Sequence, residues 1–315
     1  MSQTSINSPR IFWKTPLAWL SSLWEFSRPH TIVGTSLSVL ALYLIALATV
    51  DSTVNLENIQ YLLIALFPCL CGNVYIVGLN QLEDQEIDKI NKPYLPLASG
   101  YFSQIQGRYI VSITGLLAII TSWLGGSWLG ITVVLSLLIG TAYSLPPIRL
   151  KRFPLLAAFC IFTVRGVVVN LGVFLYFIHS FTSTSFLVPE VLILTAFVVI
   201  FTVAIAIFKD VPDLEGDQEY NITTFTILIG KKAIFKISCG VIIFCYLGMI
   251  IIGLLSSFNI NQPLLIGSHV ALLPLLLWRS QRVDLEDKNS IAQFYQFIWR
   301  LFFLEYLLFP LACLV

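Results

Sequence analysis

The chain has 315 residues, of which 57% are hydrophobic and 11% are charged, and its formal net charge is +1. A soluble protein of this length normally carries about a quarter charged residues, so the composition excludes an ordinary soluble enzyme and indicates an integral membrane protein. The sequence has no basic patch of the kind that supports a nucleic-acid-binding role.

Residues 1–29 are predicted to form a short tail followed by an amphipathic segment, Arg10 to Ser27, that lies on the membrane surface. Aromatic side chains anchor such segments at the bilayer surface, and here they are Trp13, Trp19, Trp24 and Phe26. A disordered tail is the alternative for residues 1–10. This region resembles neither a cleavable signal peptide nor a transit peptide, which favours a bacterial membrane over an organelle import precursor.

Residues 30–315 are predicted to form one all-α membrane domain with nine transmembrane helices around a central cavity. Apolar stretches of about 20 residues, long enough to cross roughly 30 Å of hydrocarbon as a helix, recur throughout it. The nine stretches are Thr31 to Val50, Ile59 to Asn80, Arg108 to Leu124, Trp128 to Leu145, Pro154 to Ile178, Val191 to Phe208, Ala233 to Leu255, Pro263 to Trp278 and Ile291 to Val315.

Basic residues are distributed unevenly between the connections. All of the 18 Lys and Arg residues except Arg165 and Arg300 lie in the lead or at the ends of the second, fourth, sixth and eighth stretches, and the connections on the opposite side contain none. Because Lys and Arg accumulate on the cytoplasmic side, we expect a cytoplasmic N-terminus and, with an odd number of spans, Val315 on the far side.

A row of polar residues follows the second stretch, in the sequence NQLEDQEIDKINKP. Asn80, Asp84 and Asp88 are spaced four residues apart, and a step of four residues in a helix is about 40° more than a full turn. They are therefore predicted to share one helix face. Asn73, seven residues before Asn80, extends this face into the membrane.

A second acidic row follows the sixth stretch, in the sequence KDVPDLEGDQEY. Asp210, Asp213 and Asp217 are separated by steps of three and four, and they share a face if the helix continues through Pro212. The two rows lie four spans apart at equivalent points of the chain, which argues against two unrelated solvated helix ends. For either row taken alone, a solvated helix end stays open as the alternative.

Carboxylates gathered beside a low-dielectric cavity repel one another, so such rows require bound cations or raised pKa values. Oxygen ligands without His or Cys favour magnesium or calcium over zinc, and a diphosphate could bridge the two rows. The predicted metal ligands are Asn80, Asp84, Asp88, Asp210, Asp213 and Asp217. Six cations on the same side suit phosphate oxygens: Arg28, Lys92, Arg149, Lys151, Arg152 and Lys209. The alternative for each of them is the ordinary accumulation of Lys and Arg on the cytoplasmic side.

At these residues the chain resembles the UbiA-type intramembrane prenyltransferases, which carry an N-x-x-x-D-x-x-x-D row after the second of nine helices and a D-x-x-D-x-x-x-D row after the sixth. The resemblance spans nearly the whole chain and includes YSLPPIRLKR, where the family places a Tyr and basic residues near the diphosphate. Lys92 stands where many members have Arg. The segments FSRPHTIVGT, GNVYIVGLNQL, INKPYLPLASG and FYQFIWRLFFLEYLLFP look most like the homogentisate phytyltransferases of tocopherol synthesis.

The resemblance implies transfer of a phytyl group from phytyl diphosphate to homogentisate, with loss of carbon dioxide and diphosphate, giving methylphytylbenzoquinol. Our hypothesis is that Asp84, Asp88, Asp210 and Asp217 hold two magnesium ions that bridge the diphosphate. Tyr143 either faces the allylic cation or is an interfacial anchor. The site is expected to face the cytoplasm of a bacterial, cyanobacterial-type inner or thylakoid membrane.

Arg165 lies within the fifth stretch. A charged side chain inside a membrane span is energetically costly, so Arg165 is a candidate functional residue. Three interpretations of Arg165 stay open: it binds the homogentisate carboxylate, it binds a phosphate oxygen, or it makes a structural contact. The related activities that stay open use geranylgeranyl or solanesyl diphosphate as the donor, or 4-hydroxybenzoate or chlorophyllide as the acceptor. A secondary transporter is the alternative of another class, but it predicts inverted repeats and charges near the bilayer midplane.

Overall fold

The structure, a computed structural model, describes residues 9, 11, 12, 14–220, 223–255, 258 and 260–315, and those residues form helices and loops without a strand. Arg10 and Trp13 of the predicted surface segment lie outside the described residues. Nine of the helical segments in the described part are long and apolar enough to cross a membrane. The predicted all-α, nine-span fold is therefore confirmed.

The membrane-spanning helices follow the predicted stretches closely. They are α2 (Pro29–Thr49), α3 (Leu56–Glu83), α5 (Gln104–Gly125), α6 (Ser127–Ser144), α7 (Pro154–Phe162) continuing through the π-helical segment η2 (Thr163–Val168) into α8 (Val169–Thr182), α9 (Pro189–Phe208), α12 (Lys231–Leu255), α13 (Gln262–Ser280) and α14 (Lys288–Leu314). The short elements are α1 (Pro16–Phe26), α4 (Gln85–Asn91), the 3-10 turn η1 (Leu150–Arg152), α10 (Leu214–Glu219) and α11 (Phe225–Ile229).

Several spanning helices begin before the apolar stretch, and polar side chains cap some of them. The Asn55 side chain accepts a hydrogen bond from the backbone N–H of Asn58 at 2.8 Å, and Asn261 accepts one from Leu264 at 3.0 Å. Such caps satisfy backbone groups at a helix start. They are polar, so a search for apolar stretches places the helix start too late.

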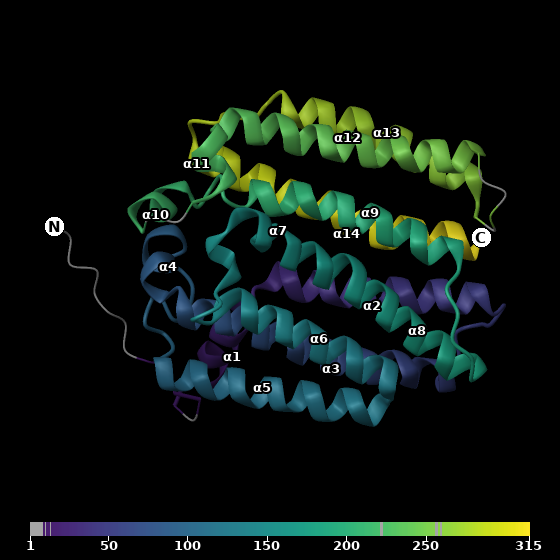
Figure 1. The fold of residues 1–315 in the computed structure, drawn as a ribbon, viewed down its shortest axis with the longest axis horizontal. Helices are drawn as coiled ribbons and strands as arrows, with labels where there is room; N and C mark the ends of the chain where they lie inside the picture. Colours follow the sequence, from purple (N-terminus) through teal and green to yellow (C-terminus); the bar gives the residue numbers. More distant parts are fainter. Residues whose placement is uncertain (1–8, 10, 13, 221–222, 256–257, 259) are drawn as a thin grey trace.

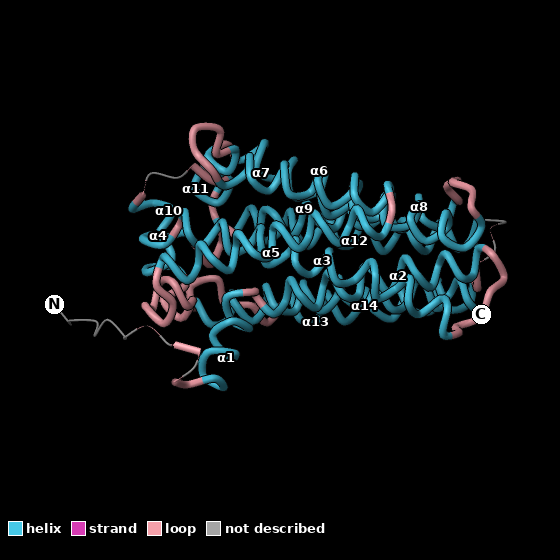
Figure 2. Tube along the Cα trace, turned by 90° about the horizontal axis from the view of Figure 1, so that it is seen from below, coloured by secondary structure: helices cyan, strands magenta, loops and turns pink. Residues whose placement is uncertain are grey.

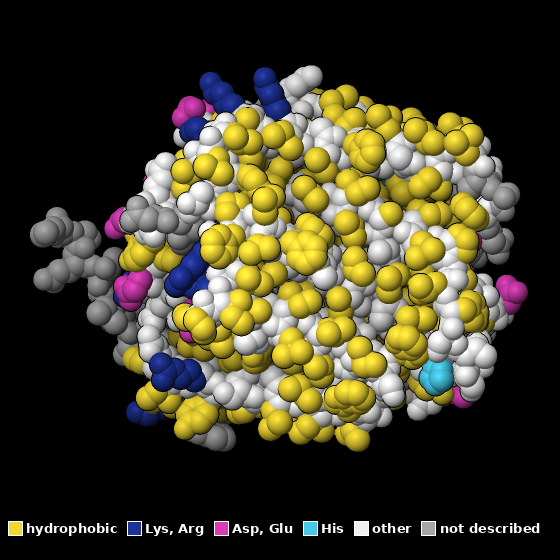
Figure 3. Space-filling view, viewed as in Figure 1, with side chains coloured by type: hydrophobic (Ala, Val, Ile, Leu, Met, Phe, Trp, Pro, Cys, Tyr) yellow, Lys and Arg dark blue, Asp and Glu magenta, His cyan; other side chains and the backbone are white. Residues whose placement is uncertain are grey.

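The spanning helices run side by side along one direction (Figures 1 and 2). In Figure 1, α12 and α13 lie at one edge and α5 lies at the opposite edge. Between them, α9 is the most enclosed of these spans, with 67% of its most apolar 18 residues buried. Apolar side chains cover the middle of the face in Figure 3, and Lys, Arg, Asp and Glu gather mainly at the end carrying α4 and α10. We call this the charged end. The chain is a multi-pass membrane protein, with its C-terminus at the opposite end.

The aromatic side chains of α1 that were predicted to be surface anchors differ in burial. Trp24 is 49% exposed, as expected of a surface anchor, whereas Phe26 is fully buried. The Phe26 ring packs against Phe102 at a centroid distance of 5.8 Å and lies over Gly78 of α3, where a Cβ would come within 2.6 Å of it. The prediction of Phe26 as a membrane anchor is therefore wrong, because α1 docks on α3 where a glycine makes room.

Candidate active site

The first polar row lies at the charged end, where α3 is followed by α4. The predicted continuous helix is interrupted at Asp84, which ends α3 and precedes α4. Helical backbone bonds persist across the break, because the Asp84 N–H donates to the Asn80 carbonyl at 3.0 Å and the Asp88 N–H donates to the Asp84 carbonyl at 2.8 Å. The three side chains therefore still line one pocket.

The second row departs further from the prediction. The α9 helix does not continue through Pro212: it ends at Phe208, and a turn leads to α10, which begins at Leu214. Proline lacks a backbone N–H and disfavours a helical conformation in the residue before it. Asp210 and Asp213 thus lie in a turn and Asp217 lies on α10, yet all three side chains line the same pocket as the first row.

This pocket is a chamber of about 520 Å³ at the charged end. It brings together residues from α1, α2, α3, α4, α6, η1, α7, α9, α10, α11 and α14, although these are far apart in sequence. Its lining includes Arg28, Asn80, Asp84, Asp88, Lys92, Tyr143, Lys151, Lys209, Asp210, Asp213 and Asp217. The structure therefore collects nearly all of the candidate site residues in one place.

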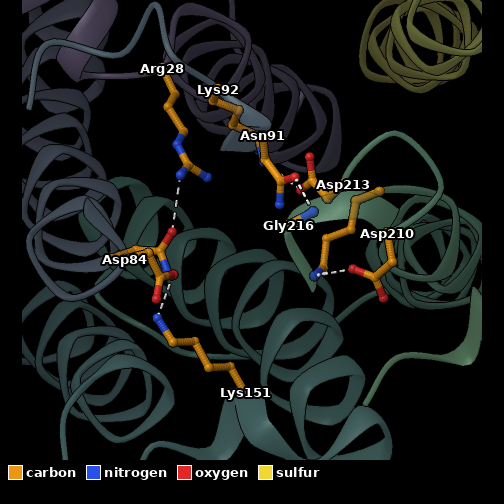
Figure 4. A network of polar contacts seen from close by, with 10 residues as sticks. Arg28, Asp84, Asn91, Lys92, Lys151, Asp210, Asp213 and Gly216 are labelled. Atoms are coloured by element: carbon orange, nitrogen blue, oxygen red, sulfur yellow. Dashed lines mark hydrogen bonds and ion pairs between the residues drawn. The ribbon is translucent and has the colours of Figure 1, made fainter. Parts of the chain in front are cut away.

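Two contacts join the rows across the chamber (Figure 4). Lys92 on the first side forms an ion pair with Asp213 on the second. The backbone N–H of Gly216 donates to the Asn91 side-chain oxygen at 2.9 Å. Sequence spacing gave no signal for Asn91 and Gly216, because their contact depends on how two short helices meet.

Each row is balanced by cations in the described part of the chain. Asp84 pairs with Arg149 at 3.0 Å and with Lys151 at 2.6 Å, and Lys209 pairs with Asp210 at 2.7 Å. Arg28 donates to the Asn80 side-chain oxygen at 3.0 Å. These ammonium and guanidinium groups are also suitable donors to phosphate oxygens.

Arg149 and Arg152 are the two predicted cations outside the chamber lining. The Arg152 side chain is exposed, whereas Arg149 makes a contact with Asp84. Arg149 adopts a left-handed conformation with φ of 38° at the start of η1. The turn, rather than the basic sequence itself, selects which side chain points inward.

The acidic side chains suit a metal that is bound together with a ligand. The Asp88 Oδ2 atom is buried without a hydrogen-bond partner, and burial raises the pKa of Asp88 to about 6 and that of Asp217 to about 7. Among the described residues, no group of three His, Cys, Asp or Glu side chains forms a metal site by itself. Magnesium commonly takes one or two carboxylates together with water and phosphate oxygens, so the residues fit magnesium carried by a diphosphate.

A second, deeper cavity of about 290 Å³ continues from the chamber into the bundle. Tyr143, Lys209 and Tyr295 are among the residues that line both, so the two spaces are contiguous. Asn73 and Arg165 line the deeper cavity. Tyr143 thus faces the internal space. This favours the predicted position facing the allylic cation over the alternative of an interfacial anchor.

A family model described as the UbiA prenyltransferase family matches residues 36–301. The chain belongs to this family. It is 54% identical over 297 residues to the homogentisate phytyltransferase of Synechocystis sp., covering 94% of this chain and 96% of that protein. It is 41% identical to homogentisate phytyltransferase 1 of Arabidopsis thaliana, covering 92% of this chain and 75% of that protein.

Solved structures share the fold of this prenyltransferase. A UbiA homolog from Archaeoglobus fulgidus bound to GPP and Mg²⁺ superposes with a TM-score of 0.64 at 15% identity, covering 93% of this chain and 99% of that one. The family predicted from the two acidic rows is confirmed, and magnesium is present in a structure with this fold.

The contact between Asn91 and Gly216 leads to a test of how closely the rows must approach. A Cβ added at Gly216 would lie 2.4 Å from the Asn91 side-chain oxygen. We expect Gly216→Ala to lower turnover about tenfold, because α10 must move away or Asn91 must give up its hydrogen bond. Adding Asn91→Ala removes the clashing atoms, so the double variant should be more active than Gly216→Ala alone. A double variant no better than the single would contradict this packing.

Proposed function

We propose that this chain transfers the phytyl group of phytyl diphosphate to homogentisate, releasing carbon dioxide and diphosphate and giving the methylphytylbenzoquinol of tocopherol synthesis. The observation that carries the proposal is the 54% identity to the Synechocystis homogentisate phytyltransferase over 94% of this chain. The chamber agrees with it, since carboxylates and cations meet there at the mouth of an apolar cavity.

In the proposed site, Asp84, Asp88, Asp210 and Asp217 would hold two magnesium ions, with Asn80 and Asp213 as further ligands or as supports of the ligands. Bound magnesium supplies positive charge that stabilises the departing diphosphate. Arg28, Lys92, Lys151 and Lys209 line the same chamber, and their cations add donors to the phosphate oxygens. Arg149 joins this set through Asp84, whereas Arg152 acts only at the exposed rim.

The deeper cavity accommodates the prenyl chain and shields the reacting carbon. As the allylic C–O bond breaks, its electron pair leaves with the diphosphate and the positive charge stays on the prenyl carbon. Tyr143 presents its ring at the junction of the two spaces, where it stabilises this charge. Asn73 is held by a hydrogen bond to Thr31 at 3.0 Å and is proposed to orient the substrates below Asn80.

We also propose that the charged end faces the cytoplasm of a cyanobacterial-type inner or thylakoid membrane, with residues 1–29 as a surface segment and residues 30–315 as the catalytic domain. The Lys and Arg residues at that end support this orientation. Accessibility of single cysteines introduced at Lys89 and at Val315 to a membrane-impermeant reagent tests it, because only the first should react from the cytoplasmic side.

Product formation with a matrix of substrates tests the reaction. Purified protein is incubated with phytyl, geranylgeranyl or solanesyl diphosphate and with homogentisate or 4-hydroxybenzoate, with and without magnesium. The expected result is methylphytylbenzoquinol from phytyl diphosphate and homogentisate, only with magnesium. A preference for another pair would reassign the substrates, and solute flux in proteoliposomes without product would favour the transporter.

The metal requirement is expected to depend on pH. A protonated carboxyl does not bind magnesium, and the pKa values of Asp88 and Asp217 are raised to about 6 and about 7. The magnesium concentration that gives half-maximal activity should therefore rise as the pH falls from about 8 to about 6.

Magnesium affinity should fall as the pH falls, whereas the stability of the metal-free protein should rise. Unfolded carboxyls ionise near pH 4, so between about pH 4 and 7 the folded protein holds the extra protons and its stability falls as the pH rises. Magnesium should accordingly raise the Tm more at pH 8 than at pH 6. An equal rise at both pH values would contradict the assignment of these two carboxyls as ligands.

A further inference from the structure

Arg165 is a half-buried cation whose surroundings in the deeper cavity differ from those of the cations in the chamber. None of the ion pairs found among the described residues includes it. Its Nη1 atom is buried without a hydrogen-bond partner. Since an unpaired charge inside a membrane span is costly, this arrangement is typical of a site completed by an anion.

Aromatic rings fix the guanidinium in place. It lies over the Trp299 ring at 4.6 Å from the centroid, with the Phe302 ring at 5.8 Å. The Trp299 ring in turn contacts His30 at a centroid distance of 4.9 Å. Stacking of this kind stabilises an Arg without neutralising its charge. Arg165 therefore lines the cavity with hydrogen-bonding capacity left for a ligand.

The backbone around Arg165 is also specialised. Arg165 lies in η2, a π-helical segment between two α-helices, and such π-bulges occur frequently at functional sites. Next to it, Gly166 faces α9, where a Cβ would meet the Val199 side chain at 2.5 Å. This close approach of α9 holds the turn that carries Arg165.

The depth of Arg165 decides which anion it can reach. It follows Pro154, at the charged end of α7, by eleven residues, which corresponds to roughly 16 Å along a helix. Of the cations proposed to bind the diphosphate, Lys92 and Lys151 line only the chamber above, whereas Arg28 and Lys209 line both spaces. Tyr295 lies one turn before Trp299 on α14 and lines both spaces, so an aromatic ring bound between the two levels would touch it.

We infer that Arg165 binds the carboxylate of the aromatic acceptor, while Trp299 and Tyr295 hold the acceptor ring beneath the diphosphate. This inference rests on the proposed function and assigns its acceptor subsite. Loss of carbon dioxide breaks the bond between the carboxyl and methylene carbons, leaving the electron pair on the methylene carbon, which takes up one proton. Alkylation releases one ring proton, so the two steps balance. The product has no carboxylate, which removes its contact with Arg165 and favours release into the bilayer.

Equilibrium binding tests the inference independently of turnover. The protein is loaded with magnesium and a non-transferable phytyl thiolodiphosphate, and the Kd is measured for homogentisate and for methylhydroquinone, which has a methyl group in place of the carboxymethyl group. Arg165→Met should weaken homogentisate binding about 30-fold, as expected for a lost charge-assisted hydrogen bond, and change methylhydroquinone binding by less than about threefold. Arg300→Met is the matched control, because Arg300 is also within a span but is exposed.

Each other outcome would overturn the assignment. Equal loss for both acceptors would make Arg165 a structural residue, loss of donor binding would make it a phosphate ligand, and unchanged binding would remove it from the site. If Arg165→Met does not fold, the wild-type protein still decides: 4-hydroxyphenylacetate should compete with homogentisate at least about 30-fold better than 4-methylphenol. Product formation from homogentisate with no preference for carboxylates would refute the subsite and leave the proposed reaction intact.

Discussion

Asp217→Asn is expected to lower turnover about a thousandfold or more while the protein remains folded. Asp217 is buried at the chamber, and its burial, followed by the neighbouring charges of Asp213 and Asp210, raises its pKa. An amide keeps the shape of the side chain but removes the negative charge that the proposed metal requires, so the leaving diphosphate loses its stabilisation. Asp84→Asn should have a similar effect. Single-turnover product formation and the Tm with and without magnesium provide the measurement.

The matched control for Asp217→Asn lies two residues earlier on the same helix. Glu215 of α10 is exposed and pairs with Lys288 at 2.5 Å, outside the chamber lining. Glu215→Gln removes the same charge from the same short helix, and an exposed pair contributes little to stability. It should leave turnover within about twofold of the wild type. Similar losses in both variants would mean that charge on α10, rather than a metal ligand, controls the reaction.

His269→Leu is expected to cause the largest loss of stability. His269 of α13 contacts Glu305 of α14 at 3.0 Å, and both side chains are almost fully buried outside the two cavities. The Glu305 Oε1 atom already has no hydrogen-bond partner. Removing one member of a buried pair leaves an uncompensated polar group and typically costs about 3 kcal/mol. A fall in Tm of about 5–10 °C in detergent is expected.

The double variant His269→Leu/Glu305→Leu distinguishes pairing from simple packing. When both polar groups are replaced by apolar ones, no unpaired group is left, so the double variant should be more stable than His269→Leu. Turnover per folded molecule should stay close to that of the wild type in both variants, because the pair lines neither cavity. If the losses of stability from the two substitutions add, then each side chain contributes to stability independently of the other.

Features that depend on local sequence could be predicted well. The nine spans follow from apolar length, and the two acidic rows follow from their spacing after the second and sixth spans. The helix breaks were harder. Asp84 ends α3 although no proline or glycine stands there, and Pro212 ends a helix that the spacing of Asp210 and Asp217 alone would have continued. The side chains of both rows still point into the same chamber because contacts between distant segments, rather than one continuous helix, position them.

Contacts between distant segments could not be predicted from the sequence. The position of Trp299 over Arg165 depends on how α14 packs against η2, and the choice of Arg149 over Arg152 depends on a left-handed turn. The three His residues show no ligand spacing, and the partner of His269 lies 36 residues away on another helix. Sequence periodicity identifies the residues that share one face of a helix. It does not identify which other helix packs against that face, and these contacts depend on that packing.

A structure of the protein with Mn²⁺ and a non-transferable phytyl thiolodiphosphate tests the central claim most directly, because anomalous scattering locates the metal. We expect metal peaks between Asp84 and Asp88 on one side and Asp210 and Asp217 on the other, with the diphosphate joining them and the chain entering the deeper cavity. A diphosphate bound by Arg28 and the lysines without metal, or metal at one row alone, would contradict the account.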